Sequence, residues 1–349
     1  MILPASQAAT LALLLVSLIC WGIWANTLKM AGKWGFELYI CDFALGFALL
    51  AVVAAFTAGT LSSSELTFQE NFLVASYRSI AYVLVAGALF NIGNMLLTAT
   101  VSVAGMALAF SVSCGVALTV AIIRFLIFDS TGGMLVALAG AALLLAAVVL
   151  AAFAYGQLLQ ARAEAVKQAA LQADPRAKLG KRPARPPGAA LPVTLAAAAG
   201  LAFGLYHPLL DLGRIGDNPV APYGLTLLFA VSILASTVSF APFFFNFPVA
   251  GAPIAFREYF SGSSKQHSLG LLGGILAGSA FLTGMLALSV PRAGAGLSYG
   301  LSEAGPVIAV ICGLLIWREF RSSERPRLLM LGTLILLAVG IALLAVSRG

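Results

Sequence analysis

The sequence predicts an all-α membrane protein with ten transmembrane helices, arranged as two inverted five-helix repeats. Three observations lead to this fold class. Hydrophobic residues make up 61% of the 349 positions and charged residues only 9%, which leaves too little polar surface for a water-soluble globule of this size. Apolar runs of about 20 residues, long enough to cross a bilayer as a helix, recur along the whole chain. The two halves of the chain also share weak internal similarity in the same order.

Ten apolar runs meet this length requirement. Backbone groups in lipid must form their hydrogen bonds within the segment, so each run is expected to be a helix. The third and fourth runs are separated only by the short break at 102–105. We expect spans at about 8–28, 39–59, 79–98, 104–127, 133–154, 191–211, 222–245, 268–289, 295–317 and 327–346.

A polar stretch, Gly156 to Gly188, follows the fifth span. It contains the basic, proline-rich run 181–187, and a segment of this composition cannot form a hydrophobic core. We therefore expect a basic cytoplasmic linker at 156–190. It joins a first five-helix repeat at 1–155 to a second five-helix repeat at 191–349.

Lysine and arginine gather on one side of this topology. With the N-terminus outside, 15 of the 20 basic residues fall in cytoplasmic segments, which is the bias that the positive-inside rule describes. We predict a multi-pass protein of the plasma (inner) membrane with both termini outside and the linker in the cytoplasm. The net charge of +7 follows from this bias and from attraction to anionic lipid, so no nucleic-acid partner is expected.

The halves of the chain are similar to each other. A shift of 190 residues places Gly93–Asp129 over Thr283–Glu319, with Gly115 on Gly305, and a slightly different shift places 21–24 over 203–206. Because five is an odd number, the two copies must enter the membrane from opposite sides. Many secondary transporters build alternating access on such inverted repeats. A transporter is therefore favoured over a sensor or scaffold that transports nothing, and a lipid flippase or metabolite exporter is the alternative among transporters.

Glu303 stands alone within the apolar ninth span and is the candidate proton carrier. An acidic residue at the centre of a helix costs about 2.5–3.5 kcal/mol on insertion scales and is kept mostly where it faces a cavity or a partner. Gly305 and Pro306 follow it. Since proline removes an intrahelical hydrogen bond, we expect broken backbone beside a water-filled cavity. The structural alternative is a pairing of Glu303 with Arg292 or with another polar neighbour.

Aromatic residues mark the first span of each half. Trp21, Trp24 and Asn26 lie at i, i+3 and i+5, so the two indoles share a helix face. Tyr206 matches Trp24 in the second half. Flat aromatic walls with an amide suit a planar ureide or a purine-like ring, and they suit a sugar almost as well. The alternatives are core packing for both indoles and an interfacial belt for Trp21.

Further polar residues complete the predicted site. Asn91 and Asn94 share a face of the third span, where a buried amide either meets the substrate or bonds a neighbouring helix. His207 with Pro208 is expected to break the sixth span. The predicted substrate-binding residues are Trp21, Trp24, Asn26, Asn91, Asn94, Tyr206, His207, Tyr299 and Glu303.

Asp42 is a second candidate for proton coupling, after Glu303. It lies a few residues into the second span, close to Lys29 and Lys33, so a structural salt bridge is the alternative role. Arg214 lies between two aspartates at the outer end of the sixth span, and this cluster is interpreted as solvated loop charge.

Enzyme chemistry fits the sequence poorly. It shows no Ser-His-Asp arrangement, paired catalytic carboxylates or metal-type cysteine spacing, so we expect no enzyme activity, cofactor or metal. The expected partners are the lipid bilayer, a small-molecule solute and a proton or sodium ion. Glycines around Gly140 and Gly332–Gly340 allow helices to approach closely, either within one chain or in a homodimer.

Several stretches together form a recognisable pattern. They are Asn91–Asp129 (NIGNMLLTATVSVAGMALAFSVSCGVALTVAIIRFLIFD), the closing part from Gly313 (GLLIWREFRSSERPRLLMLGTLILLAVGIALLAV), Trp21-Gly22, Asp42 with the aromatic after it, and Arg318-Glu319. These stretches resemble the ureide permeases, which are ten-helix members of the drug/metabolite transporter (DMT) superfamily, and the likeness covers nearly the whole chain apart from the linker. The resemblance implies a symporter that imports a small, neutral, hydrogen-bond-rich solute such as allantoin or uracil with a proton, and a sugar transporter of the same superfamily is the alternative.

The chain departs from the plant members of that family in two places. Gly180-Lys181 lacks the upstream glycine and the following Ser or Thr of a phosphate-binding loop, so no nucleotide site is expected. The plant members carry an acid in the fourth helix near the position of Phe110. A proton role therefore cannot be transferred to that position, and the carboxylate has to come from elsewhere in the chain.

Overall fold

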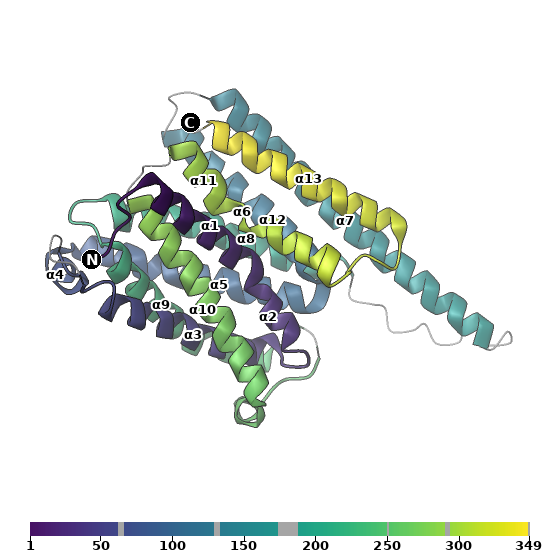
Figure 1. Ribbon diagram of the computed structural model, residues 1–349. Helices are drawn as coiled ribbons and strands as arrows, with labels where there is room; N and C mark the ends of the chain where they lie inside the picture. Colours follow the sequence, from purple (N-terminus) through teal and green to yellow (C-terminus); the bar gives the residue numbers. More distant parts are fainter. Residues whose placement is uncertain (62–65, 129–132, 174–187, 250, 290–293, 348–349) are drawn as a thin grey trace.

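The computed structural model describes the chain except for residues 62–65, 129–132, 174–187, 250, 290–293 and 348–349. Every regular element in the described part is a helix (Figure 1), so the all-α prediction is confirmed. The helices are α1 (Gln7–Ile23), α2 (Ala25–Met30), α3 (Phe36–Phe56), α4 (Phe68–Val74), α5 (Tyr77–Ala104), α6 (Met106–Phe128), α7 (Met134–Ala173), α8 (Ala190–Ile215), α9 (Pro222–Asn246), the 3-10 helix η1 (Phe256–Ser261), α10 (Ser264–Ser289), α11 (Ala295–Glu303), α12 (Gly305–Ile311), the π-helix η2 (Cys312–Ile316) and α13 (Glu324–Ser347).

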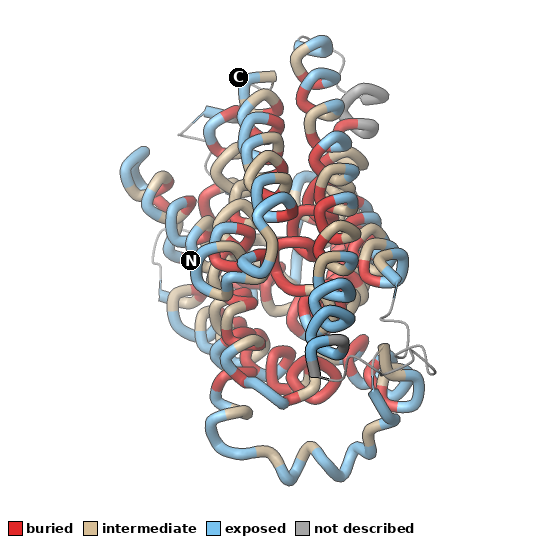
Figure 2. Tube along the Cα trace, turned by 90° about the vertical axis from the view of Figure 1, so that its right-hand side faces the viewer, coloured by how far each residue is buried: buried red, intermediate tan, exposed pale blue. Residues whose placement is uncertain are grey.

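The described residues contain nine helices that are long and apolar enough to cross a membrane, together with a shorter apolar helix at Met106–Ile122. Each of the ten predicted spans overlaps one of these segments. Buried residues lie inside the bundle and exposed ones on its periphery (Figure 2). On α3, for example, Leu45, Leu49 and Val53 recur at every fourth position and are all exposed. Such an apolar outer face matches lipid rather than water.

The predicted linker begins as a helix. α7 continues to Ala173 and extends beyond the rest of the bundle (Figure 1). Residues 156–173 are rich in alanine, glutamine and leucine, all good helix formers, and the polar character of this stretch does not oppose a helix in water. The basic run 181–187, like Arg292, lies outside the described residues.

The predicted break at His207 and Pro208 is wrong, because α8 runs from Ala190 to Ile215 with Pro208 inside it. The proline removes one backbone donor, but α8 is packed along its length against α5 and α6, which hold the two parts of the helix together. The two halves of the chain therefore differ here, since the corresponding α1 and α2 are separated at Trp24.

Helix breaks occur at three other places in the described part of the chain. α1 passes into α2 at Trp24, α5 passes into α6 at Gly105, and α11 passes into α12 at Ala304. Gly105 has a φ of +97°, a conformation that glycine adopts without strain. At Gly305 a Cβ atom would lie 2.5 Å from the Trp21 Cβ, so glycine is required for the close contact of α12 with α1.

The helices of the two halves interlock. Between the halves, α5 packs on α8, α1 packs on α10, α3 packs on α10, and α5 packs on α9. α6 also packs on α8, and α1 packs on α12. Within the halves, α6 packs on α7, and α11 packs on α13. α7 also packs along α13, α3 along α9, and α6 along α12. Every helix that contributes to the centre of the bundle therefore contacts helices from the other half of the chain.

The contact between α8 and α6 generates a prediction about stability. A Cβ atom at Gly200 would lie 2.5 Å from the Ser113 carbonyl oxygen and 2.7 Å from the Val116 Cβ. We expect Gly200→Ala to lower the free energy of unfolding by about 1–3 kcal/mol, the usual cost of overpacking. Gly156→Ala in α7, where a Cβ atom would meet nothing within 4 Å, is the control and leaves stability equal or higher. Thermal unfolding in detergent measures both; equal behaviour of the two variants would contradict this packing.

Candidate functional site

A central cavity of about 430 Å³ lies between α1, α5, α6, α8, α10 and α11. It runs from the middle of the bundle to the end of α8, where Asp211 and Arg214 form an ion pair 2.8 Å long between side chains that are about a quarter exposed. We call this end the mouth. The volume fits a small solute and falls within the usual range for ligand sites.

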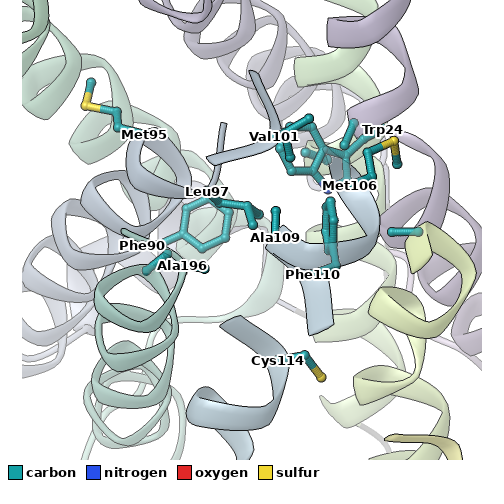
Figure 3. Packing of buried hydrophobic residues seen from close by; sticks show 14 of the residues in the cluster. Trp24, Phe90, Met95, Leu97, Val101, Met106, Ala109, Phe110, Cys114 and Ala196 are labelled. Carbon is teal, nitrogen blue, oxygen red and sulfur yellow. The ribbon is translucent and has the colours of Figure 1, made fainter. Parts of the chain in front are cut away.

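Aromatic side chains form much of the cavity wall. Trp24 and Phe110 meet edge to face with their ring centroids 6.2 Å apart, and Trp21 lies 5.8 Å from Phe90. The Tyr206 ring also contacts Phe90, with the two ring centroids 5.4 Å apart. Figure 3 shows Trp24, Phe90 and Phe110 with Cys114 on α6 nearby. These rings come from α1, α5, α6 and α8, so several helices shape a flat apolar space.

Asn94 lines the cavity and is only 1% exposed. Neither its amide nitrogen nor its amide oxygen has a hydrogen-bond partner within the described part of the protein. Ser298 on α11 also lines the cavity, and its hydroxyl likewise has no hydrogen-bond partner among the described residues. Buried polar atoms are normally paired, because an unpaired one loses its hydration without compensation. The cavity therefore presents an amide donor, an amide acceptor and a hydroxyl that can donate or accept, none of them bonded to another described residue.

Glu303 is the last residue of α11 and lines the same cavity, half-buried. The helix ends directly after it, and α12 restarts at Gly305 with Pro306 in its first turn. Among the described residues no hydrogen bond or ion pair of the Glu303 carboxylate is found. The break thus places a carboxylate beside a cavity, as the proline and the glycine had indicated.

Seven of the predicted site residues line this cavity, and the others lie elsewhere. The seven are Trp21, Trp24, Asn94, Tyr206, His207, Tyr299 and Glu303. Asn91 instead bonds α9: its amide nitrogen donates to the Ile233 carbonyl oxygen and to the hydroxyls of Ser236 and Thr237. Asn26 accepts a hydrogen bond from the Trp317 indole at 2.8 Å. Both amides hold helices together.

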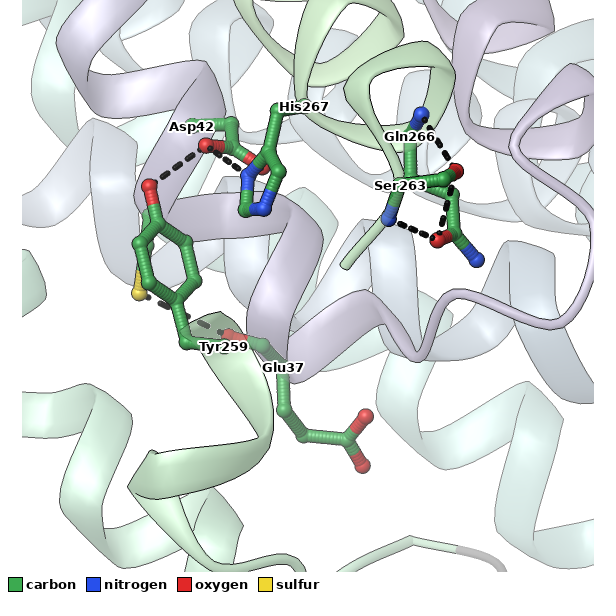
Figure 4. Close-up of polar contacts among 7 residues, drawn as sticks. Glu37, Asp42, Tyr259, Ser263, Gln266 and His267 are labelled. Atoms are coloured by element: carbon green, nitrogen blue, oxygen red, sulfur yellow. Dashed lines mark hydrogen bonds and ion pairs between the residues drawn. The ribbon is translucent and has the colours of Figure 1, made fainter. Parts of the chain in front are cut away.

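Asp42 lies outside the cavity lining, in a polar cluster of its own. The Tyr259 hydroxyl donates to its carboxylate at 2.6 Å, and the His267 ring nitrogen Nδ1 lies 3.0 Å from the same oxygen (Figure 4). Burial, together with the hydrogen bond to Asp42, raises the pKa of Tyr259, so the phenol stays protonated and keeps donating. Lys29 and Lys33, which the sequence had suggested as partners of Asp42, form no ion pair with it.

Sequence reasoning missed several residues of the cavity. Asp211 and Arg214, interpreted as loop charge, form its mouth. Phe90, Phe110 and Ser298 line it as well, but in an apolar span neither a phenylalanine nor a serine differs visibly from a packing residue. In the described part of the chain no group of three or more His, Cys, Asp or Glu residues is placed to hold a metal ion.

The helices and the cavity between them define a multi-pass membrane protein with a central pocket. No protein-family model matches the chain. Over 167 aligned residues it is 29% identical to Ureide permease 5 of Arabidopsis thaliana; the alignment covers 43% of this chain and 38% of that protein, so the chain spans well under half of this relative. A solved crystal structure shares the fold with a TM-score of 0.51 at 17% identity, over 97% of this chain and 96% of the other.

The two asparagines of α5 generate a matched prediction. Asn91→Ala removes three hydrogen bonds to α9, so we expect the free energy of unfolding to fall by about 1–2 kcal/mol. Asn94→Ala removes an amide that has no partner, so stability stays equal or rises. Thermal unfolding without added solute compares the two variants. A larger loss for Asn94→Ala than for Asn91→Ala would contradict the assignment.

Proposed function

We propose that this protein is a secondary active transporter that carries a small, neutral, hydrogen-bond-rich solute, a ureide or nucleobase such as allantoin or uracil. The observation that carries the proposal is the unpartnered amide of Asn94 in the central cavity. An amide offers one donor and one acceptor side by side, and a ring that contains neighbouring C=O and N–H groups satisfies both at once. The name of the Arabidopsis relative supports the same solute class.

The cavity wall supports a planar solute. Trp21, Trp24, Phe90 and Phe110 surround the space with ring faces and edges, and a flat heterocycle packs well against such surfaces. Ser298 adds a hydroxyl that can donate or accept, and Glu303 can accept an N–H bond. We assign these residues, with Asn94, Tyr206, His207 and Tyr299, to solute binding.

The packing of the helices supports two inverted five-helix repeats. In chain order, α1 with α2, α3, α5, α6 and α7 can be matched to α8, α9, α10, α11 with α12, and α13. This matching turns each of the largest helix contacts of the bundle into another of them or into itself. When the matched helices are exchanged, the contact of α5 with α8 corresponds to the contact of α10 with α1. The contact of α7 with α13 corresponds to itself, because these two helices are matched to each other. A two-fold relation between the repeats accounts for this symmetry, and binding at the repeat interface follows from it.

Proton coupling is assigned to Glu303. The carboxylate ends a broken helix beside the cavity, where water can bring a proton to it from the mouth. Asp42, which Tyr259 and His267 hold, is the second candidate. Sodium is the alternative coupling ion. We assign the protein to the plasma (inner) membrane, with both termini outside and the linker cytoplasmic, because of the distribution of its basic residues.

Uptake into proteoliposomes tests the proposed function. We expect a pH gradient to drive accumulation of radiolabelled allantoin or uracil, and not of glucose, because the Asn94 amide matches the edge of a cyclic amide. Glucose uptake would indicate a sugar transporter of the same fold. If the gradient drives none of the three solutes, the proposed function is wrong.

Replacement of the Glu303 carboxylate distinguishes proton coupling from movement of the solute across the membrane. We expect Glu303→Gln to abolish gradient-driven accumulation while exchange of solute across the membrane continues, since the amide cannot carry a proton. Glu164→Gln, at an exposed acidic position in the extended part of α7, is the control and leaves accumulation unchanged. Full accumulation by Glu303→Gln would remove this residue from the coupling role.

A further inference from the structure

Glu319 joins three segments at the end of the bundle opposite the mouth: its own, which follows η2, and those of α2 and α6. Its carboxylate forms an ion pair with Lys29 of α2 and accepts the backbone N–H groups of Met106 and Ala107, each at 2.8 Å. These N–H groups belong to the first turn of α6, where a negative charge is favoured by the unpaired donors and the helix dipole. The Glu319 side chain is only 8% exposed.

The backbone around Glu319 is shaped to admit the carboxylate. A Cβ atom at Gly105 would lie 2.5–2.7 Å from the carboxylate atoms, and one at Gly313 would lie 2.8 Å from Oε2. Arg318 adopts a φ of +52°, which residues other than glycine rarely do. The π-helix η2 and this strained residue turn the chain back beneath α6. A strained backbone that delivers one side chain to one position marks a functional constraint.

The same three segments also form the cavity. Trp24 lines the cavity, and Lys29 follows it in α2, roughly 7–8 Å further along the helix. Phe110 lines the cavity one turn beyond the N–H groups that Glu319 accepts. Glu303 precedes Glu319 on the third segment, formed by α11, α12 and η2. The mouth at Asp211 and Arg214 lies at the other end of the pathway.

We propose that Lys29 and Glu319 form a gate that closes the cavity on the side opposite its mouth. The inference rests on the proposed transport function, because a carrier must open its site to each side in turn. Separation of the pair would free the end of α2 from α6 and from the segment that follows η2, because Glu319 would keep its hydrogen bonds to α6. The Lys29 side chain is 22% exposed, so water can take up its ammonium when the pair separates during a transport cycle, while Glu319 keeps its two N–H partners on α6.

Neighbouring contacts add to the closed arrangement. The Lys29 ammonium lies 5.2 Å from the centre of the Trp317 ring, and the Trp317 indole donates to Asn26. Arg162 of α7 donates to the Glu319 carbonyl oxygen at 3.1 Å. Lys33, Glu37, Arg162 and Arg318 line the same hollow as Lys29 and Glu319. Removing the ammonium of Lys29 leaves the hydrogen bonds of Glu319 to α6 in place.

Labelling of Cys114 tests the gate without relying on transport. Cys114 lines the cavity, so the other three cysteines (Cys20, Cys41 and Cys312) are replaced by alanine, and a small membrane-impermeant methanethiosulfonate is added to either side of sealed vesicles. With the gate intact, we expect Cys114 to react from one side only. In Lys29→Gln and Glu319→Gln it reacts from both sides, with at least a tenfold faster reaction from the formerly closed side.

Two further variants control the experiment. Lys33→Gln removes a nearby lysine for which the described residues offer no ion pair, and it keeps one-sided labelling. Lys29→Arg keeps the charge and restores one-sided labelling. If Glu319→Gln fails to fold, Lys29→Gln carries the test alone. One-sided labelling of Lys29→Gln would overturn the gate. Two-sided labelling of Lys29→Gln would support the gate even if the unaltered protein accumulates none of the solutes tested, and that failure would count only against the proposed solutes.

Discussion

Lipid offers no hydrogen bonds, and this constraint governs the whole structure. Each polar group within a span must find a partner in the protein or face a wet cavity. Many polar side chains find a partner: the Thr98 hydroxyl donates to the Asn94 carbonyl oxygen and the Ser113 hydroxyl to that of Ala109, one turn earlier in the same helix, and the Asn91 amide nitrogen donates to α9. Two side chains with unpartnered atoms, Asn94 and Ser298, meet in one cavity. Their convergence turns a packing bundle into a candidate binding site.

Interrupted helices give this cavity its chemistry. Uninterrupted helices would bond all their backbone groups internally and would offer a solute only side chains. Here α1 and α2 separate beside Trp24, and α11 ends at Glu303 before α12 begins. Glycine at 305 lets the two interrupted segments touch, since any larger residue would meet Trp21. The same two segments lead to Lys29 and Glu319, so a movement of either segment would change both the cavity and the proposed gate.

Composition and spacing were sufficient to predict the helices and several of the side chains that line the central cavity. Apolar runs located each span, and the Glu303-Pro306 sequence predicted a broken helix correctly, because an acid and a proline are both costly in lipid. The break at Pro208 was predicted wrongly, since tertiary packing of α8 overrides the proline. Asn91 and Asn94 are chemically identical and three residues apart, so only the neighbours of each amide, Ser236 for Asn91 and the cavity for Asn94, distinguish them. Glu319 pairs with Lys29 across 290 residues, a separation that no local pattern reveals.

Thermal unfolding of the purified protein with candidate solutes tests most directly whether the Asn94 amide recognises the solute. A ligand that binds the folded state raises its melting temperature in proportion to the logarithm of its concentration above Kd. We expect allantoin or uracil to raise the melting temperature of the unaltered protein and to have no effect on Asn94→Ala. The same increase in both proteins, or no increase with any cyclic amide, would contradict recognition through Asn94.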